Sequence, residues 1–143
     1  SLPKSIPLTK SIKDVIDFDG EKDDKFYYTP EKCSFYDELK RSMVTSDTIY
    51  QWRRVYVREN KNNLVPTLTA NMGTGGHNVP LILTHDSRIR KLTPRECFNV
   101  QGFPKTFKLP DQSNGRLYKQ AGNSVVVPVI TRIAKSIILA LSN

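Results

Sequence analysis

Two cysteines are the first residues in this chain that could do chemistry. Cys97 lies in the stretch TPRECFNVQGFP, and Cys33 lies in a separate stretch, EKCSFY. Two cysteines are too few for a disulfide framework, and their spacing is not that of a zinc site. A nucleophilic cysteine needs a neighbouring histidine or cations to lower its pKa, and Cys97 has no histidine beside it in the sequence. We therefore predict that both thiols are reduced and that both cysteines pack in the core.

A glycine-rich loop and the two histidines are the next candidates. The loop covers residues 71–78 within TLTANMGTGGHNVPLILT. No GKS or GKT follows its glycines, so it matches a phosphate-binding P-loop only weakly. His77 has no carboxylate nearby in the sequence, which favours a polar loop residue over a general base, and we interpret His85 in the same way. The glycines indicate a loop whose backbone adopts conformations that other residues rarely adopt.

Arginines and aromatic residues alternate from Ile49 onwards, in IYQWRRVYVREN, with the period of a strand that has two distinct faces. Residues 1–48 carry 8 Lys/Arg against 10 Asp/Glu, whereas residues 49–143 carry 14 against 4. The resulting balance of +10 suggests a nucleic-acid partner, because Lys and Arg neutralise phosphates. A solvated basic surface is the alternative.

Helix signals precede this region. Ser11 can cap a short helix that ends near Gly20. Thr29 as a cap, Pro30 at the first position and Arg41 in the last turn predict a second helix over residues 30–41. After the arginine-rich strand, two short β-like runs flank the glycine-rich loop.

Further helices are expected towards the end of the chain. Thr93 and Glu96 have the spacing of a capping box for a helix over about 94–101. A short helix ending near Gly122 is followed by a longer one that starts at Asn123 or Ser124. Apolar residues at three- and four-residue intervals predict a buried stripe on this last helix, and they are Val126, Val129, Ile130, Ile133, Ile137 and Leu141. In a chain this small, such a stripe suggests a partner surface.

Length and composition limit the classes of protein. The 143 residues suit one domain, or part of a larger protein, and a hydrophobic content of 38% is ordinary for a globular chain. No apolar run approaches the roughly 20 residues of a membrane-spanning helix, and the beginning does not look like a signal peptide. We expect an α+β protein that lies in the cytoplasm and has no membrane partner.

Three stretches, in this order and spacing, resemble the C-terminal third of a DNA (cytosine-5)-methyltransferase of the restriction-modification type. RKLTPRECFNVQGFP and KQAGNSVVVPVI are similar to the family's ninth and tenth signature blocks, and PTLTANMGTGGHNVP with the preceding QWRRVYVREN resembles its target-recognition region. The resemblance implies a connector over 1–48, a target-recognition region of short twisted strands over 49–104, and a C-terminal helical segment over 105–143. It also implies that the long last helix packs on a Rossmann-like catalytic domain that this chain does not include.

The resemblance also implies two sets of site residues. Asn123, Ser124 and Val125 would contribute part of the S-adenosylmethionine pocket, and Asn123-Ser124 would also cap the last helix. The proposed contacts to double-stranded DNA are Gln51, Arg53, Arg54, Tyr56, Arg58, Thr67, Thr69, Asn71, Gly73, Gly75 and Gly76. Arginine forks, amides and hydroxyls read base edges, and glycines let the backbone approach DNA closely.

The chemical centre of the family is not in this chain. The family's nucleophile lies in a Pro-Cys pair and its assisting acid in a Glu-Asn-Val triplet, but Cys33 follows Lys32, Cys97 follows Glu96, and Glu59-Asn60 continues into Lys61. We therefore expect no catalytic residue, no metal site and no methyl transfer by the chain alone. The catalytic partner would be another part or subunit of the same enzyme. The alternatives are a freestanding DNA-binding module and an RNA-directed member of the family.

Overall fold

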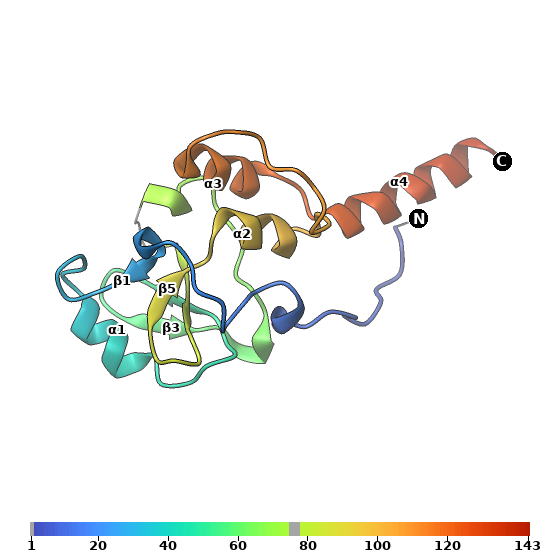
Figure 1. The fold of residues 1–143 in the computed structure, drawn as a ribbon. Coiled ribbons are helices and arrows are strands. Elements are labelled where there is room, and N and C mark those ends of the chain that lie inside the picture. Colours follow the sequence, from blue (N-terminus) through green and yellow to red (C-terminus); the bar gives the residue numbers. More distant parts are fainter. Residues whose placement is uncertain (1, 75–77) are drawn as a thin grey trace.

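The computed structural model describes residues 2–74 and 78–143, which form an antiparallel sheet with helices packed around it (Figure 1). The sheet has the order β1-β5-β4-β2-β3. Its strands are β1 (Tyr27–Tyr28), β2 (Tyr50–Trp52), β3 (Val57–Glu59), β4 (Pro80–Leu83) and β5 (Ile89–Lys91). This arrangement confirms the α+β class expected from the sequence.

The helices lie around the sheet and at the end of the chain. The α-helices are α1 (Tyr36–Ser42), α2 (Pro94–Val100), α3 (Asn114–Asn123) and α4 (Val127–Leu141), and the short 3-10 turns are η1 (Ile12–Asp14), η2 (Asp24–Phe26), η3 (Lys61–Asn63) and η4 (Met72–Thr74). In Figure 1, α2 and α3 lie together above the sheet, whereas α1 lies at its lower end. α4 extends away from this body.

Helix α2 occupies the centre of the core, as its sequence signals predict. The Thr93 hydroxyl accepts a hydrogen bond from the backbone N–H of Glu96, and the Glu96 carboxylate accepts one from the backbone N–H of Thr93, so the capping box is present. Gly102 follows the helix with a φ of +89°. The Cys97 side chain is completely buried, which confirms that this cysteine packs in the core.

A buried ion pair connects the first residues of the body to the sheet and to α2. Both terminal nitrogens of Arg90 lie 2.8 Å from the two carboxylate oxygens of Glu96, and Arg90 is completely buried. The Asp17 backbone joins this pair: its carbonyl accepts from Arg90, and its N–H donates to Glu96. Each charge therefore has an opposite charge and further hydrogen bonds, which a buried pair requires.

The arginine-rich stretch is a hairpin, and the prediction of one continuous strand was wrong. β2 and β3 pair with each other in antiparallel register, with Trp52 opposite Val57. The backbone N–H of Arg53 donates to the carbonyl of Tyr56 at 2.8 Å, and Arg54 has a φ of +72°. A positive φ is uncommon outside glycine and breaks a strand, so the alternating pattern continued across a turn that has no glycine or proline to mark it.

Three other predicted elements are shorter than expected. The helix that begins at Ser11 is only the single turn η1, and residues 30–35 form turns before α1 begins at Tyr36. There, Phe35 stacks on Trp52 of the sheet with ring centroids 4.4 Å apart, so a tertiary contact replaces the first turns of the predicted helix. Of the two β-like runs around the glycine-rich loop, only the second forms a strand, β4.

The last helix differs most from the prediction. It begins at Val127, and Asn123 and Ser124 instead end α3, so they do not cap α4. The apolar stripe exists but is not buried in this chain: Ile137 is 55% exposed and Leu141 is 82% exposed. By length and composition alone, the helical stretch Asn114–Leu141 would be apolar enough to cross a membrane. α4 therefore presents an apolar surface that nothing in the described body covers.

Candidate nucleic-acid interface

The turn between β2 and β3 and the adjoining strand β3 carry three of the predicted DNA-binding side chains. Arg54, Tyr56 and Arg58 are exposed, and Tyr56 is 53% exposed despite its large ring. Val55, at the tip beside them, is 81% exposed. A tight turn with arginine forks and an aromatic ring on its surface has the donors and the shape to enter a DNA groove.

The second predicted segment, residues 67–74, is held in a compact conformation by its own polar groups. Thr69 Oγ1 lies 2.8 Å from Asn71 Oδ1, and the Thr74 hydroxyl donates to the Asn71 carbonyl at 2.7 Å. Thr67, Asn71 and Thr74 are exposed, and Thr69 is half-buried. Gly75, Gly76 and His77 lie outside the described residues. The exposed groups in the described part are hydroxyls and an amide, which can hydrogen-bond to bases or phosphates.

This segment packs directly against helix α3. A methyl group at Gly122 would lie 2.3 Å from the carbonyl carbon of Thr69, and one at Gly73 would lie 2.9 Å from Cβ of Tyr118. Side chains at these two positions would therefore push the segment off the helix. These two glycines therefore allow residues 69–73 to pack closely against α3.

One hydrogen bond connects the hairpin turn to Asn78, the last residue of the glycine-rich loop. The Arg53 guanidinium donates from Nη1 to Oδ1 of Asn78 at 3.1 Å, and the Arg53 side chain is partly buried. Residues 53 and 78 are 25 positions apart in the chain, so this contact brings the hairpin turn and the end of the glycine-rich loop together. Gln51 differs from its neighbours, because it is only 4% exposed and its side chain does not face solvent.

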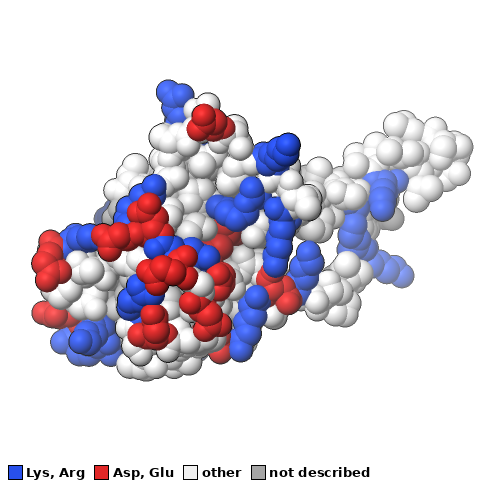
Figure 2. Space-filling view, in the orientation of Figure 1, with Lys and Arg blue, Asp and Glu red and all other residues white. Residues whose placement is uncertain are grey.

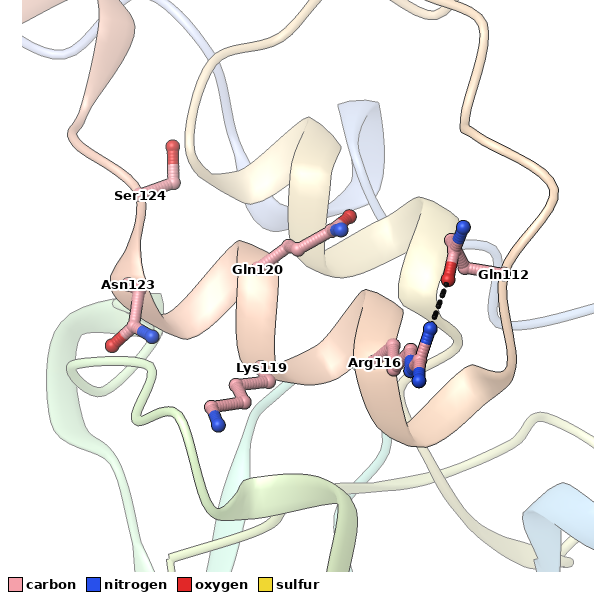
Figure 3. Close-up of a pocket in the computed structure, with 6 residues that line it drawn as sticks. All are labelled: Gln112, Arg116, Lys119, Gln120, Asn123 and Ser124. Carbon is pink, nitrogen blue, oxygen red and sulfur yellow. Dashed lines mark hydrogen bonds between the residues drawn. The ribbon is translucent and has the colours of Figure 1, made fainter.

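The three predicted cofactor contacts lie at the junction of α3 and α4. Asn123 and Ser124 border a shallow hollow of about 590 Å³ along α3 (Figure 3), and Val125 beside them is 52% exposed. The other residues that line the hollow are Gln112, Arg116, Lys119 and Gln120. In Figure 3 all six side chains come from α3 or its two flanks, and none carries a carboxylate. The amide of Asn123 and the hydroxyl of Ser124 are suited to hydrogen bonds with a polar ligand.

Neither cysteine has the surroundings of a nucleophile. Burial raises the pKa of the Cys97 thiol far above its usual range, and Glu96 raises it further. Burial also raises the pKa of Cys33. A thiol is reactive as the thiolate, so burial and a raised pKa disfavour the reactive form of both cysteines. Among the described residues, no group of three or more His, Cys, Asp or Glu could hold a metal ion.

Comparison with known proteins identifies the family. The family model of the C-5 cytosine-specific DNA methylases matches residues 2–139. The chain belongs to this family. It is 64% identical over 137 residues to the type II methyltransferase M.Bsp6I of Bacillus sp. (strain RFL6), a match that covers 96% of this chain and 43% of the relative.

Two further methyltransferases match the chain over different lengths. The type II methyltransferase M.DsaV of Dactylococcopsis salina is 31% identical over 137 residues, covering 95% of this chain and 37% of the relative. M.MspI of Moraxella sp is 54% identical over 56 residues, or 39% of this chain and 13% of the relative. The chain thus spans less than half the length of each of these relatives.

Within this methylase chain, the structure reveals one polar cluster that the sequence did not indicate. His85 lies 2.6 Å from Asp19 through Nδ1 and 2.8 Å from Asp47 through Nε2, and its ring stacks on Phe18. Hydrogen bonds to the carboxylates of Asp47 and Asp19, which accept them, raise the pKa of His85. The partners are 66 and 38 positions away, so only the fold brings them together. Because the cluster is exposed and tethers three chain segments, its evident role is structural.

Proposed function

We propose that the chain is the target-recognition and C-terminal part of a DNA (cytosine-5)-methyltransferase, which transfers a methyl group from S-adenosylmethionine to carbon 5 of a flipped cytosine. Residues 1–48 would connect the preceding catalytic domain to residues 49–104, which would recognise DNA, and residues 105–143 would return to the catalytic domain. The observation that carries the proposal is the Arg53–Asn78 hydrogen bond, which holds the exposed hairpin turn against the end of the glycine-rich loop.

The exposed residues of the turn, of β3 and of residues 67–74 suit the groove of double-stranded DNA. The exposed forks of Arg54 and Arg58 suit base edges or phosphates, and the hydroxyl and amide groups of residues 67–74 suit shorter contacts. Arg53 is engaged with Asn78, so we assign it to positioning the turn, and we assign Gln51, which is buried, to the support of β2. Gly73 keeps the segment close to α3.

The junction of α3 and α4 would contribute a minor part of the cofactor site. S-adenosylmethionine has amino, carboxylate and hydroxyl groups, and Asn123 and Ser124 offer an amide and a hydroxyl at the edge of the hollow. The exposed Val125 could add an apolar contact. The remainder of the enzyme would hold most of the cofactor and would supply the nucleophile.

The apolar face of α4 favours a part of an enzyme over a freestanding DNA-binding module. Val129, Ile130 and Ile137 are exposed on one helix. Exposed apolar patches mark interaction sites, so this face is expected to be covered by another part of the enzyme. A membrane is a less suitable partner, because the 15 residues of α4 span only about 22 Å and the hydrocarbon core is about 30 Å thick. We propose that α4 packs on the catalytic domain, that no membrane is involved, and that the enzyme acts in the cytoplasm on DNA.

Methyl transfer tests the proposal directly. The pure chain, incubated with labelled S-adenosylmethionine and mixed-sequence DNA, should transfer no methyl group above background. The same chain combined with the catalytic part of the enzyme should restore transfer to one DNA sequence. Transfer by the chain alone would overturn the proposed division of labour, and restored transfer to RNA instead of DNA would favour the RNA-directed alternative.

The exposed arginine in the turn tests base recognition. In the complete enzyme, Arg54→Ala should cost roughly 1 to 3 kcal/mol of binding free energy on the cognate site and little elsewhere, if Arg54 reads a base edge. The measurement is the affinity for cognate and scrambled duplexes at several salt concentrations. Equal losses on both duplexes, with a salt slope lowered by about one, would mean that Arg54 contacts only phosphate.

A further inference from the structure

The exposed face of α3 contains two cations that have no ion-pair partner among the described residues. Arg116 and Lys119 are exposed and border the same hollow, and Gln112 accepts a hydrogen bond from Arg116 Nη1 at 3.0 Å. In Figure 3 this bond holds the Arg116 guanidinium against the start of the helix, while Lys119 extends from the next turn. A spacing of three residues places both cations on one side of the helix.

The opposite side of α3 fixes the helix firmly in the body. Leu117, Tyr118 and Ala121 are buried. The Tyr118 hydroxyl donates to the carbonyl of Leu92, and the Gln101 amide donates to the carbonyl of Ala121 at 2.9 Å. The cations on the outer side therefore have a rigid support, which lowers the entropic cost of a contact.

The position of α3 places these cations beside the recognition segment. Residues 69–73 rest directly on Gly122 and Tyr118 of the same helix, so DNA that touches the segment passes close to the outer side of α3. Residues 97–143 contain six Lys or Arg and a single acid, Asp111. Figure 2 likewise shows the acidic side chains concentrated over the part of the body far from α4, with cations between that part and the helix.

We propose that Arg116 and Lys119 bind phosphates of the DNA backbone and so set the position of the duplex over the recognition segment. This inference rests on the proposed DNA-binding function and adds a second, sequence-independent surface to it. Phosphate contacts fix the register of a protein on DNA without reading bases. Gln112 acts as a positioning residue, because its hydrogen bond orients the Arg116 fork.

The test compares three single-charge variants of the 143-residue chain on one duplex. Arg116→Gln and Lys119→Gln should each weaken binding to cognate and scrambled DNA alike, by roughly threefold to tenfold, and each should lower the salt slope by about one. Lys40→Gln is the matched control, because Lys40 is an exposed cation on α1, at the far end of the body (Figure 1). It should bind like the unmodified chain, and thermal melting of each variant checks the fold.

The outcomes separate this inference from the proposed function. If Arg116→Gln and Lys119→Gln bind DNA normally while Arg54→Ala weakens binding, the α3 surface is wrong and the recognition proposal survives. If the unmodified, folded chain binds no duplex at low salt, both fail. If the two α3 variants leave DNA affinity unchanged but weaken S-adenosylmethionine binding in the complete enzyme, Arg116 and Lys119 serve the cofactor instead of DNA and the inference is overturned.

Discussion

The body of the molecule buries its apolar residues, whereas helix α4 leaves its apolar residues exposed. In the body, Leu39, Ile49, Ile82 and Cys97 are completely buried, and the Arg90–Glu96 pair is enclosed with them. On α4 no residue is buried, although its apolar stripe is as regular as the sequence predicts. The difference shows that the spacing of apolar residues predicts which face of a helix packs against another surface. It does not predict whether that surface belongs to the same chain.

The largest effect should come from the buried pair in the body. Arg90→Ala leaves the Glu96 carboxylate buried without its counter-charge, which typically costs about 3 to 5 kcal/mol of unfolding free energy. Urea unfolding of the variant measures it. Arg88→Ala is the control, because Arg88 forms exposed pairs with Glu21 and Asp86 that should contribute about 1 kcal/mol or less. Similar losses for both variants would contradict the assignment of the buried pair as the anchor.

A smaller loss is expected at the core cysteine. Cys97→Ala removes one buried sulfur and should cost about 1 to 2 kcal/mol of unfolding free energy through lost packing. The methyl transfer of the complete enzyme should not change, because the thiol is buried and its pKa is raised. Cys33→Ala is the matched control. A complete enzyme that is stable but inactive with Cys97→Ala would refute the packing role.

The sequence predicted local structure well where one short pattern determined it. The capping box of Thr93 and Glu96 predicted α2 almost to the residue, and the packing role predicted for Cys97 agrees with its complete burial. The sequence-based prediction was wrong where contacts between segments distant in the chain determine the local structure. The turn at Arg54 interrupts an alternating pattern without a glycine, and the stacking of Phe35 on Trp52 shortens α1. The Arg53–Asn78 contact at the candidate site likewise depends on tertiary structure.

A pH-dependent effect should appear at the histidine cluster on the surface of the body. Asp47 and Asp19 raise the pKa of His85 in the folded state, so the cluster stabilises the fold fully below the unfolded value of about 6.5 and loses this contribution as pH rises through the folded pKa. Lys13 and His85 lower the pKa of Asp47, so its contribution is lost as pH falls below about 3.8 and through the folded value.

Urea midpoints measured between about pH 5.5 and 8.5 test this cluster. The unmodified chain should lose stability relative to His85→Gln as the pH rises, until the two curves become parallel. Asp47→Asn should reduce the same pH dependence, because it removes one of the two carboxylates that face the imidazole. A constant difference between the unmodified chain and His85→Gln over the whole range would show that protonation of His85 does not matter.

The smallest effect on stability should come from α4, and it is the sharpest test of the comparison. Ile137 is 55% exposed and Ile82 is completely buried, so the same change to alanine removes the same atoms from the two regions. Ile82→Ala should cost about 2 to 5 kcal/mol of unfolding free energy, whereas Ile137→Ala should stay within about 0.5 kcal/mol. Binding to the catalytic part of the enzyme should instead depend on α4. Ile137→Asp should weaken this binding, because it places a charge in the proposed apolar contact. Equal losses of stability for the two alanine variants would mean that α4 already folds onto the body of this chain.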